Sequence, residues 1–88
     1  MPFELRIVTP EGQAFEGAVD TVVLPGSEGE FGVLPHHERF LTPLRPGEVV
    51  IRRGGETLRA TISDGFAEVR GDAVTVLVAE WKPASEGR

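Results

Sequence analysis

The residues best suited to metal chemistry stand together in one short run, His36-His37-Glu38. Imidazole and carboxylate groups are common zinc ligands, so a small metal-dependent hydrolase is one hypothesis for this chain. Adjacent residues on an extended chain point to opposite faces, however, and the sequence contains no third histidine. We therefore interpret the two histidines as surface or interface residues and expect no metal site.

Glycines and acids alternate in a second candidate segment, Gly26 to Gly32. Its glycine spacing could indicate a phosphate-binding loop, but strand-like residues follow it and nearby carboxylates would repel a phosphate. Glu28 and Glu30 could form a general acid–base pair only inside a dry pocket, whereas a glycine-flanked loop is typically wet. Two interpretations stay open from the residues: two solvated acids, or an acidic patch that meets a polar or basic partner.

Nucleophilic chemistry has no support in this chain. It contains no cysteine, which excludes disulfides, thiolate catalysis and cysteine zinc sites. Ser27 stands among acids, Ser63 precedes the turn residues Asp64-Gly65, and Ser85 lies close to the C-terminus. None of the three has the surroundings of a nucleophile elbow. We expect no catalytic residue, no cofactor and no small-molecule substrate.

The composition is that of one globular domain. The 88 residues are 40% hydrophobic and 26% charged, with a net charge of −5. The negative net charge argues against nucleic acid as a partner, and the nine Lys and Arg residues are scattered along the chain without a basic cluster. The N-terminus lacks the features of a signal peptide, and no apolar run has the length of a membrane span. Any membrane association should therefore be indirect, through another subunit.

Short strands must position the candidate residues, because prolines at positions 2, 10, 25, 35, 43 and 46 leave no room for a useful helix before residue 46. Further along, Leu58, Ala60 and Ile62 alternate with polar residues, which is the period of a half-buried strand. Gly54-Gly55 stands between two such runs and indicates a two-residue hairpin turn.

We predict strands near residues 4–9, 13–17, 18–24, 31–34, 39–45, 48–53, 57–63, 65–70 and 73–79. Short strands at this spacing, rich in valine and threonine, predict an all-β fold: an antiparallel β-sandwich or flattened barrel of about 8–10 strands. One domain should cover residues 1–82. The polar run PASEGR at residues 83–88 should form a frayed tail.

The chain resembles the N-terminal β-sandwich of the ε subunit of F-type ATP synthases, called δ in mitochondria. The resemblance covers nearly all 88 residues and rests on several segments in a fixed order. These segments are LRIVTPEGQAFEG, GSEGEFGVLP, the histidine at His37, LTPLRPG, Gly54-Gly55, SDGFAEV and VTVL. Each is weak alone, and together at these spacings they make a specific signature.

The resemblance implies a non-catalytic rotor subunit of a proton- or sodium-translocating complex, peripheral on the cytoplasmic face of the bacterial inner membrane. In that family the sandwich clamps the foot of the γ subunit and rests on the polar loops of the c-ring, which couples ion flow to ATP synthesis. Carried over by position, the residues facing the c-ring are Ser27, Glu28, Gly29, Glu30 and Phe31. Those facing γ are Thr9, His37, Arg39, Phe40 and Thr42.

Two departures from the family pattern qualify this expectation. The family usually has a glycine before the histidine and a small residue with a proline after it, whereas this chain reads PHHERF at residues 35–40, so its partner contacts should differ there. Most bacterial ε subunits also continue into a two-helix domain, and without it we expect no inhibition by an inserted helix. An independent small-ligand-binding β-sandwich is the alternative, although the chain offers few aromatics for such a site: five Phe, one Trp and no Tyr.

Overall fold

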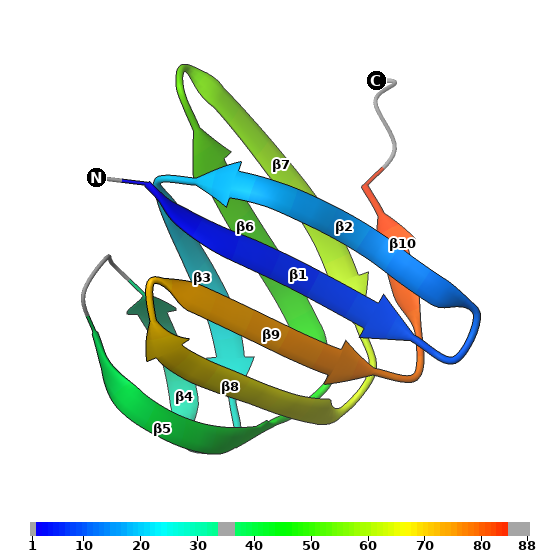
Figure 1. Ribbon diagram of the computed structural model, residues 1–88. Helices are drawn as coiled ribbons and strands as arrows, with labels where there is room; N and C mark the ends of the chain where they lie inside the picture. Colours follow the sequence, from blue (N-terminus) through cyan, green and yellow to red (C-terminus); the bar gives the residue numbers. More distant parts are fainter. Residues whose placement is uncertain (1, 34–36, 85–88) are drawn as a thin grey trace.

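The computed structural model describes residues 2–33 and 37–84, without the side chains of His37 and Glu38. These residues form ten strands and no helix (Figure 1). The strands are β1 (Phe3–Thr9), β2 (Gly12–Val19), β3 (Thr21–Gly26), β4 (Gly29–Val33), β5 (His37–Leu44), β6 (Gly47–Arg53), β7 (Glu56–Ile62), β8 (Gly65–Gly71), β9 (Ala73–Val78) and β10 (Trp81–Pro83). In the part of the chain so described, no helix is long and apolar enough to cross a membrane.

The strands follow one another in the order β10-β7-β6-β3-β5-β8-β9-β1-β2, with β4 paired to β3. A single residue pair, Gly26 with Leu44, joins β3 to β5, and the sheet divides there into two layers. The first layer holds β10, β7, β6, β3 and β4, and the second holds β5, β8, β9, β1 and β2. Figure 1 shows them wrapping into a barrel-like sandwich. The predicted fold class is confirmed.

The predicted alternation decides which side chains fill the space between the layers. In β1, Leu5 and Ile7 are buried while Arg6 between them is exposed. In β7, Ala60 and Ile62 are buried as predicted. The core is wholly apolar: among the described residues no polar or charged side chain is buried. Side chains that alternate in this way give each layer one dry face and one outer face.

The boundary between β2 and β3 differs from the prediction, and a side-chain hydrogen bond lies at that point. The predicted strands 13–17 and 18–24 become β2, which runs to Val19, and β3, which starts at Thr21. Asp20 makes the break: its amide donates to the Arg52 carbonyl at 2.7 Å, and its carboxylate accepts a hydrogen bond from the Gly54 amide at 2.8 Å. A side chain that bonds to distant backbone ends one strand and begins the next.

The sequence does not predict β10. Its three residues pair with β7, with Trp81 opposite Ile62 and Pro83 opposite Ala60. Proline is tolerated there because β10 is an edge strand with no further neighbour on the ladder. The Ala84 amide also donates to the Arg59 carbonyl at 2.8 Å. Ordered backbone thus continues past the predicted domain end at residue 82, and the rest of the predicted tail, residues 85–88, lies outside the described residues.

Candidate functional site

The acidic turn, Ser27–Phe31, consists of the two residues that join β3 to β4 and the first three residues of β4, and it contains all five residues assigned to the c-ring side. Glycine shapes it at two points. Gly29 has φ +134°, which favours glycine. At Gly26, just before the turn, an added Cβ would lie 2.7 Å from the Gly29 carbonyl oxygen and 2.9 Å from the Phe31 ring. The hairpin can close this tightly only because both positions lack a side chain.

The acidic turn presents its carboxylates to solvent and keeps one apolar anchor. Ser27, Glu28 and Glu30 are exposed, whereas Phe31 is half-buried against the core. The Phe31 ring meets the Phe40 ring of β5 edge to face, with 6.1 Å between centroids and 60° between planes. An acid–base pair needs a dry pocket, which these exposed acids do not have, so the arrangement suits contact with a partner surface.

Backbone hydrogen bonds fix the acidic turn to β5. The Ser27 amide donates to the Pro43 carbonyl at 3.2 Å, and the Arg45 amide donates to the Pro25 carbonyl at 2.9 Å. Thr42 and Pro43 line a surface hollow together with the turn. The structure therefore brings the residues assigned to the c-ring beside Thr42, one of those assigned to γ.

The remaining residues assigned to γ are distributed around β5 and β1. Arg39 is exposed on the outer side of β5, while Phe40 and Thr42 lie half-buried on its inner side. Thr9 ends β1, where its hydroxyl accepts a hydrogen bond from the Glu11 amide at 3.1 Å and donates to the Gly12 carbonyl at 3.2 Å. The set does not form one continuous cluster, and the His37 side chain lies outside the described residues.

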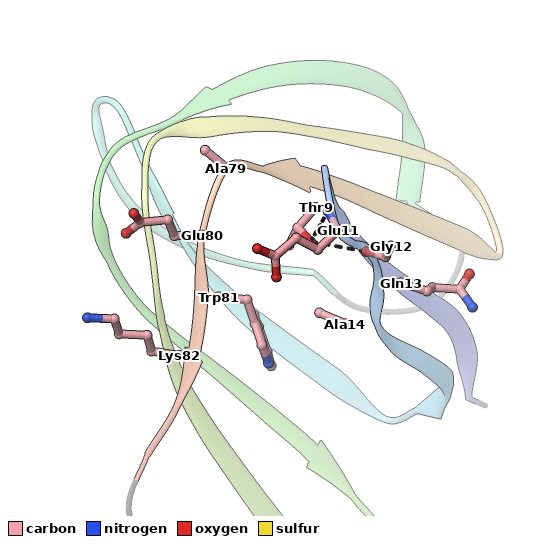
Figure 2. Close-up of a pocket in the computed structure, with 9 residues that line it drawn as sticks. All are labelled: Thr9, Glu11, Gly12, Gln13, Ala14, Ala79, Glu80, Trp81 and Lys82. Carbon is pink, nitrogen blue, oxygen red and sulfur yellow. Dashed lines mark hydrogen bonds between the residues drawn. The ribbon is translucent and has the colours of Figure 1, made fainter.

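An open pocket lies at the seam where β2 and β10, the two ends of the strand order, face one another. Trp81 of β10 and Ala14 of β2, drawn in Figure 2, line it from opposite edges. The hydrogen bonds drawn there stay within the turn at Thr9. A ligand site needs a few polar groups that converge on one point. This pocket is instead a gap between two sheet edges.

The metal hypothesis depends on residues that the structure largely leaves undescribed. His36 lies outside the described residues, as do the side chains of His37 and Glu38. Among the side chains that are described, no group of three His, Cys, Asp or Glu residues could hold a metal ion.

Sequence reasoning missed three exposed apolar side chains. Leu41, Phe66 and Leu77 are 68%, 51% and 52% exposed. A signal was present in the pattern: in FAEVR and AVTVLV the alternation puts Phe66 and Leu77 at outward positions, where polar residues usually stand. These positions therefore give the outer side of β5, β8 and β9 an apolar character among the described residues.

Residues 2–84 match the family described as the ATP synthase delta/epsilon chain, beta-sandwich domain. Among curated relatives, the ATP synthase epsilon chain of Syntrophobacter fumaroxidans is 51% identical over 84 residues, covering 94% of this chain and 62% of the relative. That of Maricaulis maris is 46% identical over 74 residues, covering 84% of this chain and 56% of the relative. The chain thus spans about three fifths of the length of the curated relatives it matches.

A solved structure has the same fold. One chain in the cryo-EM structure of the Euglena gracilis mitochondrial ATP synthase, OSCP/F1/c-ring in rotational state 1, superposes with a TM-score of 0.88 at 28% identity. The superposition covers 93% of this chain and 53% of that chain.

Proposed function

The chain belongs to the family of the ATP synthase delta/epsilon chain β-sandwich domain, and from that premise we propose that it is a non-catalytic subunit of the central stalk of an F-type ATP synthase. In this role it couples the γ subunit to the c-ring during ATP synthesis. The site contributes binding and stiffness, and it needs no cofactor. Through the complex the chain is peripheral to the membrane, on the cytoplasmic face of the bacterial inner membrane.

One observation carries the proposal: nearly the whole chain superposes, at 28% identity, on a chain from a structure that contains F1 and a c-ring. The geometry of this chain agrees with such a position. The acidic turn follows the end of β3, where Gly26 pairs with Leu44, and β5 extends away from it along the second layer. One subunit can therefore touch the c-ring through the acidic turn and γ through β5.

A rotor part must resist shear, and the hydrogen-bonded ladders supply that resistance. Pairing runs without a gap from β10 to β2, and the acidic turn is fixed to β5 by the Ser27–Pro43 and Arg45–Pro25 backbone bonds. A close-packed apolar interior deforms little under load. A force applied at the acidic turn therefore passes into both layers of the sandwich.

The contact with the c-ring is electrostatic in character. Glu28 and Glu30 are exposed, so they can meet basic side chains of a partner without a large desolvation cost. Exposed ion pairs orient partners and speed their encounter more than they add affinity. Attachment to the c-ring should accordingly be weak by itself and should depend on salt, with γ supplying the stronger contact.

We would test the proposal with purified γ subunit and detergent-solubilised c-ring from the same organism. The chain should form a one-to-one complex with γ on size-exclusion chromatography and should bind the c-ring at low salt. Glu28→Ala/Glu30→Ala should weaken c-ring binding about 2- to 30-fold, because each exposed pair contributes about 0.2–1 kcal/mol. The same variant should keep its thermal unfolding midpoint and its binding to γ. If the unmodified chain bound neither γ nor the c-ring, the proposal would be contradicted.

A further inference from the structure

The apolar core is incompletely covered at the seam between β2 and β10, the two ends of the strand order. Some apolar side chains pack against the core but stay half-buried. Several of them line the pockets of the seam: Ala14, Phe15, Leu58 and Trp81. The seam is therefore an opening to the core.

Strand register shows which backbone groups of β2 face β1, the strand with which it pairs. The Glu4 amide of β1 donates to the Asp72 carbonyl at 2.8 Å, so the backbone groups of Glu4 face β9. Neighbouring residues of a strand turn their backbone groups in opposite directions. Leu5 therefore faces β2, and its partner Gly17 faces β1.

The residues on either side of Gly17 have free backbone groups. Glu16 and Ala18 turn their amides and carbonyls toward the seam, where no strand of the described chain pairs with them. Asp20 continues the same series, and its amide crosses to the Arg52 carbonyl at 2.7 Å, which closes the seam at that end. β2 contains neither proline nor lysine, two residues that commonly protect an edge strand. Its edge is therefore available to a further strand.

The opposite edge offers fewer hydrogen-bonding groups. β10 spans only Trp81–Pro83, and Pro83 has no amide hydrogen. The Ala84 amide that follows is already bonded to the Arg59 carbonyl of β7 at 2.8 Å. A strand added in the seam would therefore take its backbone hydrogen bonds from β2.

An apolar slot of about 220 Å³ lies between the two edges. Phe15 of β2, Leu58 of β7 and Trp81 of β10 line it, together with the buried Ile51. The Arg53 guanidinium lies over the Phe15 ring, 5.5 Å from its centroid, and helps to hold it in place. Because an engineered cavity of about 150 Å³ can bind benzene, this slot has room for one aromatic or branched aliphatic side chain.

The seam also has a polar end, next to the turn between β1 and β2. In Figure 2 the Trp81 ring is directed toward Ala14, and the Glu11 carboxylate is directed toward β10. Glu11 takes part in none of the described ion pairs, and the chain has a net charge of −5. A basic side chain would therefore be attracted to this end.

We propose that the seam is a docking groove for an extended segment of a partner protein, which adds to β2 as a further strand. Three features define that segment. The free backbone groups of Glu16 and Ala18 need an extended chain, the slot takes one large apolar side chain, and Glu11 favours a lysine or arginine beside it. The lining residues do not belong to the acidic turn, so the inference goes beyond the proposed function.

The probe is a fluorescent synthetic peptide, acetyl-Lys-Thr-Lys-Phe-Thr-Val-Thr-amide, which alternates apolar and polar side chains. Its control is the same peptide N-methylated at alternate amides, because methylation removes the donors that strand pairing needs. Fluorescence anisotropy measures binding, and amide hydrogen exchange by NMR locates it. The unmethylated peptide should bind and should slow exchange of the Glu16 and Ala18 amides, whereas the methylated peptide should do neither.

Two variants test the edge and the slot separately. Ala18→Pro removes a free amide without breaking a bond to β1, and proline is tolerated on an edge strand at such a position. Ala14→Leu adds bulk at a residue that lines both pockets of the seam. Each change should weaken peptide binding about fivefold or more. Ala73→Leu adds the same bulk at an exposed site on β9 and should leave binding unchanged. Thermal unfolding checks that each variant folds.

The proposal is overturned if the peptide binds more weakly than a dissociation constant of about 1 mM, or if the methylated peptide binds equally well. Binding that leaves exchange at Glu16 and Ala18 unchanged would place the peptide elsewhere and would overturn it too. If the unmodified chain dimerises in sedimentation and Ala18→Pro abolishes the dimer, a second copy occupies the edge instead of a partner. Since γ and the c-ring are assayed separately, the proposed function can stand when this inference fails.

Discussion

At the scale of single residues, two glycines at or just before the start of a strand should behave in opposite ways. Gly65 begins β8, where an added Cβ would collide with the Leu77 backbone carbonyl and lie 2.8 Å from Val78 Cγ1. Backbone cannot yield as a flexible side chain does. Gly55, in the turn between β6 and β7, has no atom within 4 Å of such a Cβ and has no positive φ.

We therefore predict that Gly65→Ala destabilises the fold by about 1–3 kcal/mol, the usual cost of overpacking. Since about 1 kcal/mol shifts the unfolding midpoint of a domain this small by about 4–8 °C, the change is readily measured by thermal denaturation. The matched control, Gly55→Ala, should stay within about 0.5 kcal/mol of the unmodified chain. Equal midpoints for the two variants would mean that β8 starts differently from the arrangement described.

At the scale of elements, β10 depends on a serine. Ser63 lies in the link between β7 and β8, and its Oγ accepts hydrogen bonds from the Ala79 and Glu80 amides, each at 3.0 Å. Its own amide donates to the Glu80 carbonyl at 3.3 Å. The serine thus ties the segment leading into β10 to the end of β7, the strand with which β10 pairs.

Ser63→Ala should therefore loosen β10 before it unfolds the domain. Two amides lose their acceptor at a half-buried site, a loss of about 1–2 kcal/mol. Amide hydrogen exchange should speed up about 5- to 30-fold at Lys82 and Ala84, whose amides face β7, and stay nearly constant in β1 and β9. Ser63→Thr keeps the hydroxyl and should restore protection. Unchanged exchange in the alanine variant would show that pairing with β7 alone holds the strand.

The same element marks the limit of what sequence could predict. Alternation identified most strands because each has one dry face, as Leu58, Ala60 and Ile62 illustrate. It could not identify Trp81–Pro83, since three residues hold too few alternations and the proline suggests a strand end. Nor could it show that β1 pairs in parallel with β9, because side-chain alternation has the same period in parallel and antiparallel ladders.

For the candidate site, too, some residues could be placed from local sequence, whereas others depend on how distant strands pair. Local sequence is enough to place Glu28 in an exposed turn and Glu30 close to it, at the start of β4, because glycines and acids favour turns and solvent. The inward direction of Phe40 depends on the register of β5 against β8, including an irregularity between His37 and Phe40. Register across strands far apart in the chain is a tertiary property, and the exposed Leu41, Phe66 and Leu77 could be assigned to one outer side only once it was known.

At the scale of the whole molecule, stability and docking should respond differently to salt. The four described ion pairs are all surface pairs, with side chains 42–61% exposed, and such pairs contribute about 0–1 kcal/mol each. The core contains no buried polar or charged side chain among the described residues. Salt also screens the repulsion of a chain with net charge −5, which offsets the loss of these pairs.

We predict that raising sodium chloride from 0.05 M to 1 M moves the thermal unfolding midpoint by less than about 5 °C, because apolar burial is not screened by salt. The same change should release the chain from the c-ring, because the acidic turn acts through exposed charges that are screened beyond about 3 Å at 1 M. Binding to γ, which we propose as the stronger contact, should survive it. Circular dichroism and binding to the two separate partners measure the three responses on one preparation. A midpoint that falls by more than about 10 °C would show that surface charges hold the fold together. Loss of γ binding at high salt would show that exposed charges carry the γ contact as well.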